Sequence, residues 1–324
     1  MDVDRPSAAK AVSPDVDAIV VTTGGTVVHE CVEQLQDQRL RRVIVVDNGS
    51  GERPANAVVV PLEHPAGATV ARNRGVQAGD APLLLFLDDD ALAEPGAVSL
   101  LAETLIATPA AAATAGRLVD PETRETQDAY RPRKFPNFRT LVALFAGLPG
   151  FWPKNPWTGG HLRRPLDEAT PVPVEFAPSA CLMVRRSALE GVGGWDERFW
   201  FWWEDVDLTK RLAADGELIY VPGATFRHLG GSTSRRYSEP EVLIRFSHGL
   251  LCYVQSHFAF PQRLASGVLL VAVGAFRRVR LARRKPDLAL AYRSVAMGAL
   301  RLLRGRAVPS LQKLLGDAHL GPPS

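Results

Sequence analysis

Cysteine is scarce in this sequence, and its placement excludes two common ways of stabilising a chain. Cys31, Cys181 and Cys252 are the three cysteines among 324 residues. They are odd in number, lie far apart and form no CxxC pair, which argues against a disulfide framework and against a zinc site. Such usage is typical of a reducing compartment, so we expect a cytoplasmic protein.

Long apolar runs, a strong net charge and internal repeats are also lacking. The longest uncharged apolar stretch, residues 264–276, is too short to span a bilayer unaided. Residues 1–14 contain acids and prolines but no apolar centre, so they do not fit a signal peptide, and we expect a short disordered lead. The net charge of +3 gives no indication of a nucleic-acid partner.

The most informative stretch is an apolar run that ends in three acids. Leu83 to Leu87 lead directly into Asp88, Asp89 and Asp90. A continuous apolar run predicts a strand buried on both faces, and ligands bind above the carboxyl ends of such strands. Adjacent acids repel one another, and a divalent cation such as Mg²⁺ or Mn²⁺, shared with phosphates, is the natural counter-charge. A solvated acidic turn is the simpler alternative.

Strand-like and helix-like segments alternate along the first two thirds of the chain. We expect strands at 17–22, 42–47, 57–61, 83–87, 180–184 and 218–221, helices at 27–40, 68–79, 95–108 and 204–216, and a loop at 226–232. This alternation predicts an α/β fold with a parallel, doubly wound sheet. Residues 130–168, rich in proline, tryptophan and basic residues, predict either a loop that binds a lipid or sugar diphosphate, or an irregular loop pinned by buried tryptophans. A short apolar helix is expected inside it at 141–148.

The chain becomes helical after Glu239, with main helices expected at 242–258 and 263–284. The second helix has an apolar side and a basic end formed by Arg277, Arg278, Arg280, Arg283, Arg284 and Lys285. A basic amphipathic helix is typical of binding to an anionic membrane surface, and packing on the preceding domain is the alternative. We therefore divide the chain into a lead at 1–14, a domain at 15–238 and a basic helical region at 239–324.

Three separated segments carry groups for metal binding and proton transfer. If they converge, Asp90 and His228, with Asp88 through water, would hold a divalent metal that neutralises a diphosphate leaving group. Glu204 or Asp205 would accept a proton from an incoming hydroxyl, because a carboxylate at a helix N-terminus stays ionised. In isolation, these acids are equally explained as ordinary first-turn residues, and His228 as a loop histidine.

Residues at other strand ends complete the outline of a nucleotide-sugar site. Thr22 and Asp47 are placed to bind a nucleotide, although Asp47 could merely cap a turn. Arg72 and Asn73 could reach a phosphate or a base. The aromatic residues 199–203 would shield the site and offer an apolar platform to a sugar. The reaction expected of such a site is displacement at an anomeric carbon.

Taken together, these motifs resemble those of family 2 glycosyltransferases of GT-A fold over about residues 17–234. The resembling segments are 45–50, 71–75, 87–91, 193–197, 203–208 and 228–232. The resemblance implies a mixed, mostly parallel sheet, a metal and diphosphate motif at Asp88–Asp90, Asp205 as catalytic base, and Glu204 helping to bind the acceptor. It also implies acceptor contacts from Trp195, Asp196, Trp202 and Trp203.

Within the family, the segment 151–158 makes the chain most similar to bacterial rhamnosyltransferases. That implies inverting transfer from dTDP-rhamnose to a glycan or polyprenyl-linked acceptor at the inner face of the cell membrane, in cell-envelope polysaccharide synthesis. Rhamnosyltransferases often have Asn-Pro-Asp where this chain has Asp88-Asp89-Asp90. A galactofuranosyl or other hexosyl transferase therefore stays open.

Three other functions fit parts of the pattern. A phosphatase of the haloacid dehalogenase type needs Thr or Val where this chain has Leu92. A nucleotidyltransferase needs a basic, glycine-rich first loop, and residues 23–26 have glycines without Lys or Arg. A degenerate nucleotide-sugar-binding module would have lost Asp90 or Asp205, and both are present.

Overall fold

The computed structural model describes residues 15–145, 148–159, 169–230 and 236–320. The expected lead at 1–14 and the last two residues of the expected loop at 226–232 lie outside this range. The strands are β1 (Val16–Thr22), β2 (Arg42–Asp47), β3 (Val58–Pro61), β4 (Leu83–Asp88), β5 (Ala91–Ala93), β6 (Ala111–Val119), β7 (Val172–Val174), β8 (Cys181–Arg185) and β9 (Glu217–His228).

The described strands form one mixed sheet. Their order is β3-β2-β1-β4-β8-β6-β9-β5, and β7 pairs with β9. The pairings make β1, β2, β3, β4, β6 and β9 run in one direction, while β5, β7 and β8 run in the other. The α/β class with a mixed, mostly parallel sheet and C-terminal helices is confirmed.

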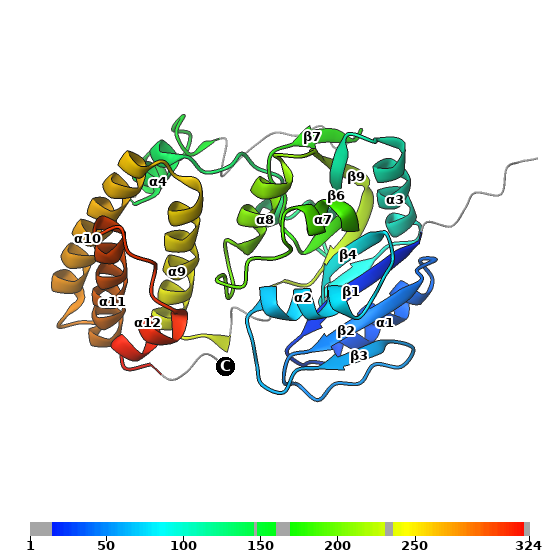
Figure 1. Cartoon of the computed structure of the whole chain (residues 1–324), viewed down its shortest axis with the longest axis horizontal. Coiled ribbons are helices and arrows are strands. Elements are labelled where there is room, and N and C mark those ends of the chain that lie inside the picture. The colour runs from blue at the N-terminus through cyan, green and yellow to red at the C-terminus, as the bar shows by residue number, and fades with distance from the viewer. Residues whose placement is uncertain (1–14, 146–147, 160–168, 231–235, 321–324) are drawn as a thin grey trace, which may run out of the picture.

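Helices cover the sheet and also form a separate group at the C-terminal end (Figure 1). The bounds are α1 (Val27–Gln36), α2 (Ala68–Gln77), α3 (Ala97–Ala107), α4 (Phe138–Phe145), α5 (Leu148–Phe151), α7 (Arg186–Gly191), α8 (Glu204–Leu212), α9 (Glu239–His257), α10 (Phe260–Leu281), α11 (Pro286–Leu303) and α12 (Leu311–Asp317), with a 3₁₀ turn at Asp128–Tyr130.

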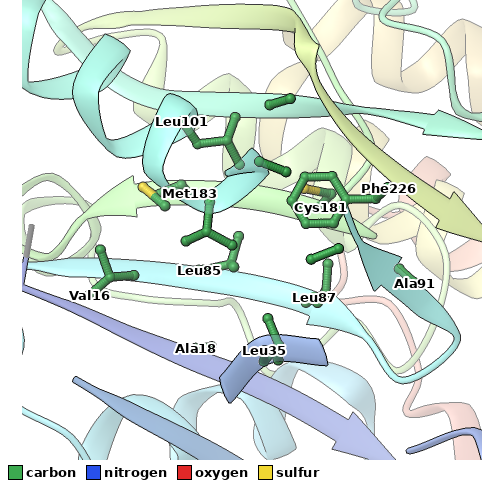
Figure 2. Packing of buried hydrophobic residues seen from close by; sticks show 14 of the residues in the cluster. Val16, Ala18, Leu35, Leu85, Leu87, Ala91, Leu101, Cys181, Met183 and Phe226 are labelled. Carbon is green, nitrogen blue, oxygen red and sulfur yellow. The ribbon is translucent and has the colours of Figure 1, made fainter. Parts of the chain in front are cut away.

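The apolar run of β4 is buried on both faces, as its sequence predicts. Leu83, Leu85 and Leu87 lie in a core cluster with residues of α1 and α3. Figure 2 shows Leu85 and Leu87 among side chains of β1, β8 and α3 in this cluster. Leu84 and Phe86 point into a second cluster with residues of α2, α7 and α8. This double burial fixes the strand, and with it the position of the acids that follow.

The strand expected at 218–221 lies within β9, but the expectation of a loop at 226–228 was wrong, because β9 extends to His228. The pairing of β6 with β9 jumps from Gly116–Val221 to Arg117–Thr225, so residues 222–224 bulge out of the ladder. Pro222 and Gly223 mark this irregularity, and local reasoning mistook a bulge for a strand end. His228 is therefore held in a sheet and not in a loop.

The C-terminal helices pack on one another and on the sheet-containing part. Gly267 and Gly274 let α10 approach α11 closely, since a Cβ at either position would lie 2.7–3.0 Å from atoms of α11. A third core cluster joins Phe199, Trp203 and Val206 to residues of α9, α10 and α11. The division at residue 238 thus stays a prediction. No described helix has both the length and the apolar character needed to cross a bilayer.

Candidate active site

The sheet brings the metal-binding candidates together. β4 and β9 run in the same direction, so Asp88 and His228 lie at the same edge of the sheet. β5 turns back and pairs Ala91 with His228, and the Leu229 N–H donates to the Asp90 carbonyl at 3.0 Å. As a result, ligand atoms of Asp88, Asp90 and His228 all lie within 4.8 Å of one another.

A pocket of about 340 Å³ opens at this edge. Eight residues that the sequence predicted for the site line it: Arg72, Asp88, Asp89, Asp90, Trp200, Phe201, Trp202 and His228. The turn after β2 contributes Asn48 and Gly49, and Pro65 and Ala66 form a neighbouring part of the wall. The predicted residues that do not line this pocket are Thr22, Asp47, Asn73, Trp195, Asp196, Trp203, Glu204 and Asp205.

The three carboxyls have different partners and different electrostatic states. His228 Nε2 lies 3.2 Å from Asp90 Oδ1. Burial disfavours the charged form of both groups, but this contact outweighs it, so the pKa of Asp90 is lowered and the pKa of His228 is raised. Burial and the neighbouring acids raise the pKa of Asp89 to about 7, against a hydrogen bond from Thr22 Oγ1 at 2.7 Å. Burial likewise raises the pKa of Asp88.

This donor set fits a divalent cation. Two carboxylates and an imidazole converge, and oxygen ligands with one nitrogen suit Mn²⁺ or Mg²⁺. Burial is the main cause of the raised pKa values of Asp88 and Asp89, and the neighbouring acids add to it. A bound cation would favour the ionised forms of these carboxyls.

Arg72 connects the acids at the end of β4 to the start of α8. Its guanidinium contacts Asp88 Oδ1 at 3.5 Å and Glu204 Oε1 at 3.3 Å. It also stacks over the ring of Trp195, with 4.6 Å between its Cζ and the ring centroid. Glu204 is buried, and its Oε2 has no hydrogen-bond partner. Burial raises the pKa of Glu204, and the charge of Arg72 opposes that rise.

A strained turn places the expected base. Trp202 and Trp203 both have positive φ, at 67° and 71°, immediately before α8. Left-handed backbone is costly for residues with a side chain and often marks a functional site. Asp205 follows in the first turn, partly exposed, with Oδ1 accepting from the Val206 N–H at 2.8 Å. Burial and the charge of Glu204 raise its pKa to about 7.

Asp47 and Thr22 do not line the pocket but help to position residues that do. Asp47 accepts hydrogen bonds from the backbone N–H groups of Ser50 and Gly51, from the Ser50 hydroxyl and from Arg53. These bonds outweigh burial and lower its pKa to about 2. The carboxylate thus shapes the turn whose Asn48 and Gly49 line the pocket. Thr22 is fully buried, with its hydroxyl on Asp89.

Three other predicted residues tie loops together instead of facing the pocket. Asn73 accepts a hydrogen bond from the Trp195 N–H and donates to the Trp195 carbonyl and the Glu197 carboxylate. Trp195 is 2% exposed and packs edge-on against Phe86, and its expected contact with an acceptor stays a prediction. Asp196 forms an ion pair with Arg198, whose Nε donates to both carboxylate oxygens and whose Nη2 donates to Oδ2.

Sequence reasoning missed Tyr130, Arg236 and Tyr237, which line the pocket. Tyr130 packs edge-on against His228, with 4.3 Å between ring centroids. Arg236 donates to the carbonyls of Thr23 and Gly24, across 213 residues of sequence. The signal in the sequence was that Arg236 and Tyr237 follow the candidate metal ligand His228 closely. The local sequence does not show, however, which strand end these two residues contact.

Comparison with known proteins identifies relatives of this chain. Residues 18–193 match the family model described as glycosyl transferase family 2. An N-acetylglucosaminyl-diphospho-decaprenol L-rhamnosyltransferase of Mycobacterium tuberculosis (strain ATCC 25618 / H37Rv) is 33% identical over 227 residues, which cover 62% of this chain and 71% of that protein. A pre-mycofactocin glycosyltransferase of the same strain is 33% identical over 205 residues, 58% of this chain and 37% of that protein.

A solved structure of GalNAc-T7 with UDP, GalNAc and Mn²⁺ is similar in fold. It superposes with a TM-score of 0.56 at 13% identity, covering 97% of this chain and 56% of the solved chain. At this identity the likeness shows the fold alone, which is that of GT-A glycosyltransferases.

Replacing Arg72 tests whether it compensates the buried carboxylates. We expect Arg72→Met to lower the free energy of unfolding by about 3–5 kcal/mol, because Glu204 would be left as an unpaired buried charge. The loss should shrink as the pH falls and the carboxyl takes up a proton. Urea unfolding measures it, with the exposed Arg74 of the same helix as control. Equal stability of Arg72→Met and Arg74→Met would contradict the interpretation.

Proposed function

The chain belongs to glycosyl transferase family 2 and is a glycosyltransferase, and we propose that it is an inverting, metal-dependent enzyme that transfers rhamnose from dTDP-rhamnose to a polyprenyl-diphosphate-linked sugar. One observation carries the proposal. Ligand atoms of Asp88, Asp90 and His228 converge within 4.8 Å at the wall of a pocket, and Arg72 connects Asp88 to the helix that begins with Glu204 and Asp205.

The pocket offers a place for the nucleotide diphosphate. The nucleoside would lie against Asn48, Gly49 and Pro65, next to the turn that Asp47 organises. The diphosphate would lie beside the metal ligands Asp90 and His228, with Asp88 as a third ligand directly or through water. A divalent cation held there supplies positive charge to the diphosphate leaving group. Arg72 and Arg236 line the same pocket and add positive charge from the protein.

Asp205 is the residue that we assign as catalytic base. Its carboxylate is partly exposed, and a pKa of about 7 suits proton transfer near neutral pH. The acceptor hydroxyl would give its proton to Asp205 while its oxygen bonds to the anomeric carbon. The bond from that carbon to the diphosphate breaks, and the electron pair leaves with the diphosphate. Because attack and departure are on opposite faces, the configuration inverts.

The acceptor assignment rests on the relative and on the aromatic surface beside the pocket. The printed name of the 33% identical relative specifies an N-acetylglucosaminyl-diphospho-decaprenol, and we propose an acceptor of this class for this chain, in cell-envelope synthesis. Trp200, Phe201 and Trp202 line the pocket and provide apolar surface for a sugar ring. Trp203 is largely buried and supports them from behind.

The outward face of α10 supports a position on the inner surface of the cell membrane. Phe260, Val268, Phe276 and Val279 are 55–79% exposed, and Arg277, Arg278 and Arg280 are exposed next to them. The opposite face packs on α11, and Figure 1 shows α10 at the end of the molecule remote from the sheet. Exposed apolar and basic side chains on one helix complement a bilayer with anionic headgroups.

Donor binding tests the proposed function. Calorimetry with Mn²⁺ or Mg²⁺ should show binding of dTDP-rhamnose in preference to UDP-galactofuranose, UDP-glucose and GDP-mannose. Asp90→Asn should abolish the metal-dependent part, because the cation loses a ligand, while the exposed Asp215→Asn should bind normally. Binding of another donor would change the sugar assignment. No binding of any donor by a folded protein would favour a degenerate module.

The role of Asp205 is tested by rate and by pH. Asp205→Asn should slow transfer about 10²–10⁴-fold while leaving donor binding intact. The base must be ionised, so kcat/KM of the wild type should rise with pH and level off above about 7. Below that pH the rate should fall about tenfold per unit. A profile that stays flat through pH 7 would remove Asp205 from this role.

Vesicle binding tests the face of α10. Phe276→Ser/Val279→Ser should weaken co-sedimentation with phosphatidylglycerol vesicles more than tenfold, because two apolar side chains no longer enter the bilayer. Ile106→Ser, an exposed apolar residue of α3, is the control. Phosphatidylcholine vesicles should bind less of the wild type. Unchanged vesicle binding would indicate that something other than a membrane covers this face of α10. The same conclusion would follow if the double variant lost only self-association, measured by light scattering.

A further inference from the structure

Gln127 makes two hydrogen bonds to His228, and together they fix the orientation of the Gln127 side-chain amide. Its Nε2 donates to the backbone carbonyl of His228 at 2.7 Å, and its Oε1 lies 2.8 Å from Nδ1 of the same residue. Gln127 was not singled out by the sequence, and it does not line the pocket.

The two bonds together determine which ring nitrogen carries a proton. A carbonyl oxygen only accepts, so the NH₂ end of the Gln127 amide must face the carbonyl of His228. The amide oxygen then faces Nδ1, and since that oxygen only accepts, Nδ1 must carry hydrogen. The neutral ring held in this way has its lone pair on Nε2, which points toward Asp90 at 3.2 Å.

Backbone hydrogen bonds hold Gln127 in this position. The Gln127 N–H donates to the Leu118 carbonyl at 3.0 Å, which ties it to β6 beside β9. Its own carbonyl accepts from the Tyr130 N–H at 2.9 Å, and the ring of Tyr130 packs edge-on against His228. One short segment therefore contacts the imidazole of His228 twice, since Gln127 bonds its Nδ1 and the ring of Tyr130 packs against it.

We propose that Gln127 is a positioning residue that holds His228 as the Nδ1–H tautomer, so that Nε2 is presented to the divalent cation. This inference rests on the proposed function, since it deepens the metal site assigned there. Groups that orient a metal-binding histidine through its other nitrogen commonly contribute 10–100-fold to metal affinity. Gln127 would contribute in this way without touching substrate or metal.

Two substitutions separate this role from a structural one. Gln127→Leu loses both hydrogen bonds, whereas Gln127→Glu loses the donor to the His228 carbonyl but keeps an acceptor for Nδ1–H. We expect Mn²⁺ affinity, measured from the electron paramagnetic resonance signal of free Mn²⁺, to fall about 10–100-fold in Gln127→Leu. Gln127→Glu should restore most of that affinity. Gln36→Leu, which removes an exposed glutamine bond to the Asn56 carbonyl, is the control.

The outcomes distinguish the inference from the proposed function. If the folded wild-type protein does not bind Mn²⁺, the metal site itself fails, and this inference fails with it. If the wild type binds but both variants match it, or both lose the same affinity in step with their thermal stability, only the role of Gln127 is overturned. Nitrogen-15 spectra of the Mg²⁺-loaded protein give an independent readout, in which His228 must keep its proton on Nδ1.

Discussion

Repulsion among three carboxylates at the end of one buried strand is the constraint on which the rest of the site depends. The double burial of β4 leaves Asp88, Asp89 and Asp90 no freedom to separate. Each acid has a different partner: Arg72 contacts Asp88, the Thr22 hydroxyl donates a hydrogen bond to Asp89, and His228 contacts Asp90. Burial raises the pKa of Asp89 to about 7, and the charges of Asp90 and Asp88 add to that rise. A divalent cation is the partner that such a cluster favours.

Arg72 connects the acids at the end of β4 electrostatically to those at the start of α8. Its contacts with Asp88 and Glu204 join the strand that leads into the proposed metal ligands to the helix that carries the proposed base. Trp195 lies under the guanidinium, and Asn73 fixes the backbone of Trp195 from the same helix as Arg72. Residues predicted to touch ligands thus form the support that keeps Arg72 in place. The distinction matters because loss of a support residue changes folding stability and geometry together.

The sequence allowed the α/β class and the buried strand to be predicted, because each depends on a local pattern. The run before Asp88 and the acids in the first turn of α8 are visible in a short window. Two kinds of error have physical causes. The strand ending at His228 was missed because residues 222–224 bulge from it. Gln127 and Arg236 were missed because sheet pairing and loop packing bring them to the site across 101 and 213 residues. Asp47 lies at the end of β2 and Asn73 within α2, as expected, and the side chains of both form hydrogen bonds within the protein.

The strained turn before α8 shows that the C-terminal helices help to position the candidate active site. Two successive residues in the left-handed region cost on the order of 1–3 kcal/mol each, and surrounding packing must maintain them. Helix α9 provides that packing, because Gly249 lies so close to Trp202 that a Cβ there would be 2.5 Å from its carbonyl oxygen. The ring of Tyr253 on the same helix contacts that of Trp203, and His257 bonds Asp207 at 2.7 Å. The position of Asp205 therefore depends on contacts from beyond residue 238, so a chain cut at the predicted boundary would lose the packing that holds its proposed base in place.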